Sequence, residues 1–300
     1  MTSIATPKFR LGGSVSRNSS SHPNPSTHSK DDTSFTSGSA SDEFKLASKA
    51  AEANCISEIR DCFRKFGIRV SDELVFRYAN FYNFDAEEAI DGIHEDNGSR
   101  YMKLKMEDLE EQFETNAVFP LPKLKTRKSD SEVIYMKPSR VNPNKNNKNS
   151  AEDGDSSSDR FIESLCYVFN DLSQTVEQCR NGVSVIADMQ DVTKENFSKE
   201  HCANLMQALQ GEMVPTRVET FIIVSPPAWF HKVFKWMKSK GSKDFLRRVH
   251  LIKPDQLAQF LMEDYELYLP DDLSGGYAVG SEICEDYMDL KSAQEEQSQQ

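Results

Sequence analysis

The sequence predicts an α/β protein in which a small helical bundle precedes a β-sheet flanked by helices. Apolar residues at helix-like spacing dominate residues 44–115. Beyond residue 116, strand-like apolar runs alternate with helical stretches, which is the pattern of an α/β sheet. Residues 217–224 are almost continuously apolar, as expected for a central strand that is covered on both faces.

Composition divides the chain into four parts. Residues 1–43 are rich in Ser, Thr, Pro, Asn and His, and we predict a disordered tail because they can bury too little apolar surface to offset their ordering entropy. Residues 44–115 should form the helical bundle. Residues 116–277 should form the sheet domain, with a flexible insertion at 140–158 that is nearly free of apolar residues. The acidic, Gln-rich residues 278–300 are predicted to form a second disordered tail.

Local signals set the boundaries of the predicted elements. Ser71 and Ser198 are placed to cap the helices that follow them. One helix is expected to run over 159–181 and to stop at Gly182. Residues 116–124 are apolar but interrupted by prolines, so we predict a connection there.

Charge and cysteine usage exclude several classes of protein. The formal net charge of −12 argues against general nucleic-acid binding. None of the six cysteines has C-x-x-C spacing, so we expect reduced thiols in a cytoplasmic protein, with no metal site and no cofactor. The N-terminus has no apolar stretch of signal-peptide length, and no run approaches the ~18–20 apolar residues of a membrane span. We expect a monomer.

A segment that mixes aromatic and basic residues stands out. On a helix, one broad face would carry Trp229, Phe230, Val233, Phe234 and Met237. The edges and the opposite face would carry Lys232, Lys235 and Lys238. Between His231 and His250 there are seven Lys or Arg residues and one acid, which is +6 in an acidic chain. The pattern fits either a buried amphipathic helix with solvated lysines or a helix that covers an apolar pocket and docks on an anionic surface.

Five segments together carry a family signature. Residues 182–188 read Gly-Val-Ser-Val-Ile-Ala-Asp, and residues 214–230 read Val-Pro-Thr-Arg-Val-Glu-Thr-Phe-Ile-Ile-Val-Ser-Pro-Pro-Ala-Trp-Phe. Residues 245–252 read Phe-Leu-Arg-Arg-Val-His-Leu-Ile, and residues 269–276 read Leu-Pro-Asp-Asp-Leu-Ser-Gly-Gly. With the helical residues 74–89, they resemble the CRAL-TRIO family of lipid-binding domains, similar to the yeast phosphatidylinositol-transfer protein.

This resemblance implies a mixed sheet that, with a movable gate helix, encloses an apolar cavity for one lipid. The gate would be residues 229–238, and its three lysines would dock transiently on anionic membranes. The implied lipid-binding residues are Val183, Val185, Phe221, Ile223, Trp229, Phe230, Val233, Phe234 and Met237. The sequence does not specify which alternate set of the strand residues faces the lipid. Arg217 and Arg248 match the positions that would bind a headgroup, although Arg217 fits a structural salt bridge equally well. Thr216 stands where phosphoinositide-binding members carry Glu, so the lipid could be a phospholipid, a sterol or an isoprenoid-like molecule.

Two other classes of function are an enzyme and a protein scaffold. Catalysis is not expected, because the His-Cys-x5-Arg signature of tyrosine phosphatases, the G-x-S-x-G elbow, the P-loop and H-E-x-x-H are absent. We interpret the acidic residues Asp188, Asp191 and Glu195 as loop solvation or helix capping. The alternative is a scaffold that binds proteins such as small GTPases, with lipid binding weak or lost.

Overall fold

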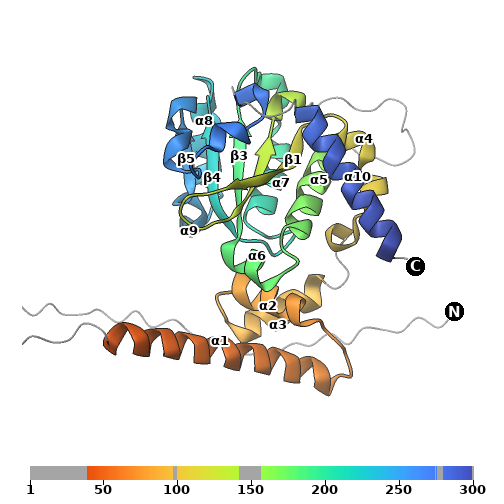
Figure 1. The fold of residues 1–300 in the computed structure, drawn as a ribbon, viewed down its shortest axis with the longest axis vertical. Coiled ribbons are helices and arrows are strands. Elements are labelled where there is room, and N and C mark those ends of the chain that lie inside the picture. Colours follow the sequence, from red (N-terminus) through yellow and green to blue (C-terminus); the bar gives the residue numbers. More distant parts are fainter. Residues whose placement is uncertain (1–38, 97–99, 142–156, 274, 276–279, 299–300) are drawn as a thin grey trace, which may run out of the picture. The chain divides into compact units, whose positions relative to one another are not determined.

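A computed structural model describes residues 39–96, 100–141, 157–273, 275 and 280–298 (Figure 1). The predicted tail up to residue 38 and most of the predicted insertion at 140–158 lie outside the described residues. Residues 45–300 form one compact unit. The predicted domain boundaries inside that unit stay a prediction.

Three helices form the N-terminal bundle. They are α1 (Ser39–Lys65), α2 (Asp72–Phe81) and α3 (Ala86–Asp96). The predicted cap at Ser71 is confirmed, because its hydroxyl accepts a hydrogen bond from the Leu74 backbone N–H at 3.1 Å. Ile59, Phe63 and Ala89 are fully buried between the helices, so the bundle has its own small core.

A five-stranded mixed sheet forms the second core. Its strands are β1 (Val118–Lys125), β2 (Glu132–Met136), β3 (Val183–Asp188), β4 (Val218–Val224) and β5 (Val249–Ile252), and they lie side by side in chain order. The β1–β2 pair is antiparallel, and the other three pairs are parallel. This arrangement confirms the predicted α/β class with a mixed sheet.

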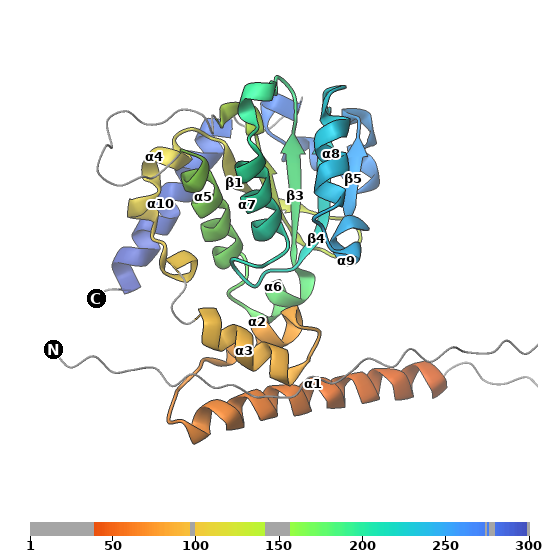
Figure 2. The ribbon, with the colours of Figure 1, turned by 180° about the vertical axis from the view of Figure 1, so that it is seen from behind.

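The longer connections between parallel strands carry the helices. They are α5 (Ser157–Asp171), α6 (Val176–Asn181), α7 (Lys199–Leu209), α8 (Phe230–Lys238) and α9 (Lys243–Leu246). Each connection advances by one strand in the same direction, so crossovers of one hand bring their helices to the same face. Figure 2 shows α5, α7 and α8 in front of the sheet.

Short elements complete the fold. They are the single α-turn α4 (Glu110–Phe113) and the 3-10 turns η1 (Arg100–Lys103), η2 (Met106–Asp108), η3 (Pro138–Arg140), η4 (Lys194–Asn196), η5 (Pro254–Gln259), η6 (Tyr265–Leu267) and η7 (Asp271–Leu273). The chain after β5 returns to the end of β1, where Thr126 bridges Leu261. This return places η5–η7 on the face away from α5, α7 and α8 (Figure 1).

Gly182 sits at the predicted helix stop, immediately before β3. Its φ of +65° is a left-handed conformation that favours glycine. A Cβ at this position would also lie 2.6 Å from the Arg217 carbonyl oxygen. The same glycine therefore ends α6 and lets β3 pair closely with β4.

Two local predictions were wrong. Residues 118–125 form β1 instead of a connection, because an edge strand tolerates prolines that cannot donate to a partner. The single helix expected over 159–181 is divided into α5 and α6. Thr175 begins α6 with a capping box in which it exchanges hydrogen bonds with Gln178, and this cap competes with helix continuation.

The C-terminal prediction is also corrected. Residues 280–298, which we expected to be disordered, form helix α10 (Gly280–Ser298). Ile283, Cys284 and Tyr287 are buried, and they lie on one stripe of the helix against the core. Polar contacts add to this stripe: Lys291 pairs with Asp171 at 2.6 Å. Acidic and Gln-rich composition concealed the stripe, because three apolar side chains are enough to dock a helix whose other faces are solvated.

Replacing Ile283 with Ala tests this correction. The side chain is 3 % exposed, so its truncation should lower the free energy of unfolding by about 2–5 kcal/mol through lost burial and a residual cavity. Leu290→Ala on the same helix is the matched control, because Leu290 is 54 % exposed and its loss should cost no more than about 0.5 kcal/mol. Equal chemical-denaturation curves for the two variants would show that α10 is not docked.

Candidate functional site

An apolar cavity lies between the sheet and the helices α5, α7 and α8. Its floor is the carboxyl end of the central strands, where Met136, Ala187 and Ile223 lie on one face in register. The helices and neighbouring loops contribute Phe161, Phe197, His201, Cys202, Leu205, Phe230 and Met237. Four phenylalanines and three methionines line the cavity, and no Lys, Arg, Asp or Glu does. Such a lining suits an uncharged, apolar ligand.

The cavity is closed in this conformation. Its volume is about 30 Å³, which is room for about two water molecules. Pockets that hold small-molecule ligands usually measure about 300–1,000 Å³. A lipid chain could therefore enter only if part of the wall moved.

Helix α8 forms a part of the wall with an apolar, buried face and a basic, exposed face. Phe230 and Met237 are buried and face the cavity, whereas Lys232, Lys235 and Lys238 are all exposed. The helix is held largely by aromatic contacts, such as the 5.9 Å approach of the Phe230 and Phe197 rings. These contacts are apolar and carry no hydrogen bond, so they can re-form after a displacement of the helix.

The expected lipid-binding residues fall into two groups. Four of them line the cavity: Phe221, Ile223, Phe230 and Met237. The other five do not line it: Val183, Val185, Trp229, Val233 and Phe234. Val185 pairs with Phe221, so it lies on the cavity face of the sheet but nearer the amino end of β3. The cavity face of β4 is the one that carries Phe221 and Ile223, and the role of each residue in lipid binding stays a prediction.

Three of the residues that do not reach the cavity belong to the gate segment. Phe234 is half-buried and stacks on Phe230 at 6.3 Å, while the Lys238 ammonium lies 4.7 Å from its ring centroid. Trp229 packs edge-on against Phe197 at 5.5 Å. Trp229 and Phe234 thus surround the rings that close the cavity.

The two arginines proposed for a headgroup lie away from the cavity. Arg217 precedes β4 and pairs with Glu219 at 2.5 Å. Arg248 precedes β5 and donates to the Val218 carbonyl at 3.0 Å, and its pKa is lowered by burial and by the neighbouring Arg217. Both stand at the amino ends of their strands, whereas the cavity lies at the carboxyl ends. The structure brings the two arginines near each other, but it does not bring them to the cavity.

Thr216, which stands where phosphoinositide-binding members carry Glu, is engaged by other residues. The buried Arg77 of α2 donates to the Thr216 hydroxyl at 3.3 Å, to the Pro215 carbonyl at 3.1 Å and to the Asn170 side chain at 2.7 Å. Arg77 thereby links the helical bundle to the start of β4. These contacts give the signature segment a structural role.

Sequence reasoning missed the α5 and α7 side of the cavity. His201 and Cys202 begin α7 behind the confirmed Ser198 cap, and both are buried. Burial raises the pKa of the Cys202 thiol to about 12, so it stays protonated at neutral pH. The His201 and Phe161 rings approach to 5.5 Å. A recognisable signal was the apolar spacing of Cys202, Leu205, Met206 and Leu209 along α7.

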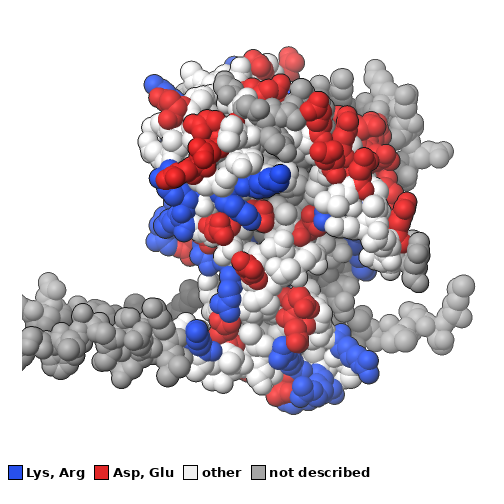
Figure 3. All heavy atoms as spheres, viewed as in Figure 1, with Lys and Arg blue, Asp and Glu red and all other residues white. Residues whose placement is uncertain are grey.

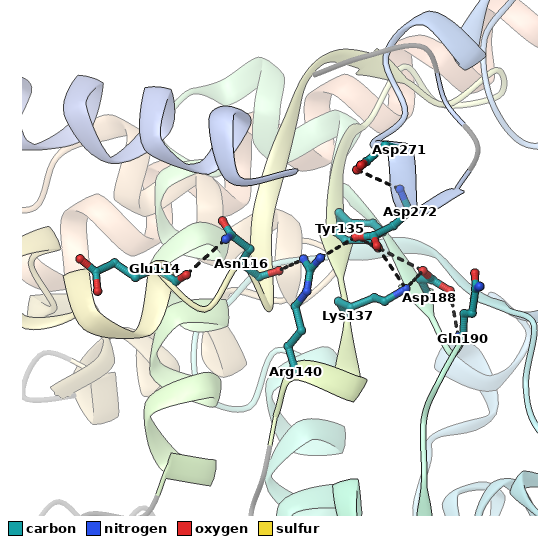
Figure 4. A network of polar contacts seen from close by, with 9 residues as sticks. All are labelled: Glu114, Asn116, Tyr135, Lys137, Arg140, Asp188, Gln190, Asp271 and Asp272. Atoms are coloured by element: carbon teal, nitrogen blue, oxygen red, sulfur yellow. Dashed lines mark hydrogen bonds and ion pairs between the residues drawn. The ribbon is translucent and has the colours of Figure 1, made fainter. Parts of the chain in front are cut away.

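A buried polar network holds the opposite face of the same strand ends (Figure 4). Lys137 forms an ion pair with Asp188, and their side chains are 6 % and 1 % exposed. The Tyr135 hydroxyl donates to Asp188 at 3.1 Å and lies 3.2 Å from Asp272. Arg140 pairs with Asp272 at 2.8 Å, which connects the strand ends to η7.

The network alternates with the cavity lining along the chain. Met136 and Ala187 face the cavity, so their neighbours Lys137 and Asp188 point to the other face. The expected solvation of Asp188 was therefore wrong, since its carboxylate is the buried partner of Lys137, although it also accepts a hydrogen bond from the Gln190 backbone N–H of the following loop at 2.9 Å. Burial and the two nearby carboxylates also raise the pKa of Tyr135. The network ties β2, β3 and η7 together behind the cavity.

Other kinds of site find no support in the part of the chain that the structure describes. It holds no group of three or more His, Cys, Asp or Glu side chains that could bind a metal ion. Among the described helices, none is long and apolar enough to span a bilayer. All six cysteines are free thiols, as their spacing predicts.

A comparison with known protein families identifies the domain. The CRAL/TRIO domain family matches residues 122–275, which include the whole sheet apart from the start of β1. A solved structure, described as the crystal structure of Sfh5, is similar with a TM-score of 0.48 and 12 % sequence identity. That match covers 79 % of this chain and 88 % of Sfh5. None of the curated proteins matches the chain.

Lys137→Met tests whether the buried network supports the strand ends. The substitution leaves the Asp188 carboxylate buried without its cation, so the free energy of unfolding should fall by about 3–5 kcal/mol in denaturant titrations. Lys105→Met is the matched control, because Lys105 also forms an ion pair, with Glu107, but at the surface. No measurable change is expected there. If the Lys137 variant is as stable as the control, the buried network does not stabilise the strand ends.

Proposed function

Because the chain belongs to the CRAL/TRIO domain family, whose domains bind lipids, we propose that it binds one hydrophobic lipid in the cavity beneath α8 and exchanges it with membranes. The observation that carries the proposal is the mainly apolar cavity wall at the carboxyl end of the sheet, which has no Lys, Arg, Asp or Glu and is closed by a helix with exposed lysines. No catalytic step and no cofactor are proposed. The free thiols fit a cytoplasmic protein that meets membranes transiently.

The lining narrows the class of ligand. A charged headgroup inside this cavity would lose its hydration without gaining an oppositely charged partner, which costs several kcal/mol. The buried part of the lipid is therefore uncharged, as in a sterol, an isoprenoid-like molecule or the acyl chains of a phospholipid. A phospholipid headgroup would remain outside, near Lys232, Lys235 and Lys238.

Opening requires movement of α8. The cavity must grow about tenfold to reach the range of ordinary ligand pockets, and α8 is a short helix held by ring contacts. Each exposed lysine near an anionic bilayer contributes about 1 kcal/mol of attraction. Docking would supply free energy to separate the apolar face of α8 from the cavity and to place that face in the lipid interface.

A second candidate function is a scaffold for proteins. The specific observation in its favour is the small cavity volume, because a pocket that never opens would leave only the surface for recognition. In that case α8 would be an ordinary buried amphipathic helix. The two functions differ in whether the cavity wall becomes accessible at a membrane.

Alkylation of Cys202 measures that accessibility. In the closed state its thiol is buried, with a pKa of about 12, so reaction with a maleimide at neutral pH should be very slow. During exchange with anionic vesicles, opening should raise the labelling rate about tenfold or more, since each unit by which the pKa falls increases the thiolate tenfold. Peptide mass spectrometry identifies the modified residue.

Cys166 is the matched control for this experiment. It is also buried, with a pKa raised by burial, but it lies in α5 beside Met213 and does not line the cavity. Its labelling should not change with vesicles. Equal acceleration at both cysteines would indicate general unfolding, and no acceleration at Cys202 would favour the scaffold.

A further inference from the structure

The turn between α8 and α9 concentrates positive charge around one serine. Ser239 is exposed and directly follows the last residue of α8. Lys235, Lys238, Lys240 and Lys243 surround it in sequence, and all four are exposed. Figure 3 shows Lys and Arg side chains gathered over α9, with acidic side chains next to them and a larger acidic group over α10.

Little negative charge within the same stretch of sequence balances these lysines. Asp244 is the only acidic residue between positions 231 and 250, and its carboxylate pairs with Arg247. The lysines therefore keep most of their attraction for an anionic partner. Negative charge added to the serine hydroxyl between these lysines would oppose their attraction for an anionic partner.

The Ser239 side chain also contributes to the end of the gate helix. It caps α8, and its hydroxyl donates a hydrogen bond to the Trp236 carbonyl oxygen at 2.6 Å. The carboxyl end of a helix carries partial negative charge from its unpaired carbonyls. An anion placed here would repel those carbonyls, and an esterified oxygen could no longer donate the hydrogen bond.

We propose that Ser239 is a phosphorylation site at which a basophilic protein kinase weakens membrane docking of α8. The inference rests on the proposed function, because it regulates the same docking surface. The Ser239 oxygen would attack the γ-phosphorus of a nucleoside triphosphate, form the new O–P bond and break the bond to the β-phosphate bridging oxygen. The nucleoside diphosphate leaves, and the hydroxyl proton passes to the kinase base.

The phosphate would change both the charge of the docking surface and the stability of the end of α8. It adds about −1.5 to −2 charges to a surface of +6, so it cancels the attraction of one to two lysines for an anionic bilayer. It also disfavours the last turn of α8, which carries the cavity-lining Met237. The modified protein should therefore bind anionic vesicles about tenfold to thirtyfold more weakly.

Substitution isolates the charge. The full chain with Ser239→Glu, which adds one negative charge, should bind phosphatidylcholine vesicles containing phosphatidylserine about fivefold more weakly than the chain with Ser239→Gln, which has nearly the same shape. Ser298→Glu is the positional control. Ser298 also lies at a helix end and donates to a carbonyl, that of Gln294, but it lies on α10. The Ser298→Glu variant should bind these vesicles as tightly as the unaltered chain does.

The outcomes separate the two proposals. Charge reversal of Lys232, Lys235 and Lys238 serves as the reference for docking itself. If this triple variant loses vesicle binding while Ser239→Glu and Ser239→Gln bind equally, the switch is refuted and docking stands. If the triple variant binds like the unaltered chain, docking and the switch are both refuted.

Enzymatic modification completes the test. Incubation with a basophilic serine/threonine kinase and ATP should place phosphate on Ser239, located by peptide mass spectrometry, and should release the chain from vesicles. Failure to modify Ser239 would overturn the assignment.

Discussion

The arrangement depends on the parallel pairing of β3 with its two neighbours. All six residues of β3 are buried, so both faces of the sheet must be covered. Because the parallel strands follow one another in chain order, the crossovers bring α5, α7 and α8 to one face. The chain after β5 and the end of β1 cover the other face. The cavity lies at the carboxyl end of the strands, because α8 packs over that end together with α5 and α7.

The two faces of the strand ends differ in how they are held. Behind the sheet, Lys137 and Asp188 form a buried ion pair whose separation would leave an uncompensated charge. In front, ring and methionine side chains make up most of the cavity wall. The first kind of contact resists displacement, whereas the second can be exchanged for contacts with a lipid. This contrast is the reason why we propose α8 as the part of the wall that opens.

Local signals in the sequence predicted much of the fold. The serine cap of α2, the stop at Gly182 and the apolar run of β4 each follow from short-range chemistry, and the structure contains all three. Long-range pairing could not be predicted from the sequence, because Lys137 and Asp188 are 51 residues apart and no local pattern identifies them as partners. The α10 helix was missed because its buried stripe is only a few residues wide.

The cavity was predictable in part. The family resemblance implied Phe221 and Ile223, although the sequence left open which alternate set of β4 residues faces the cavity, and helical spacing placed Phe230 and Met237 on one face. The wall from α7 was not selected, since His201 and Cys202 carry no pattern that points to a ligand. The closed volume depends on how all the side chains pack, which no pattern in one sequence specifies.

Native mass spectrometry of the purified chain after incubation with vesicles of a total lipid extract tests the central claim, that the closed cavity opens to take one lipid. The account predicts a one-to-one adduct that survives repurification and fragments to an apolar or phospholipid species. A bare protein mass with the total extract, and again with sterol, isoprenoid-like lipid and phosphoinositide offered singly, would contradict it.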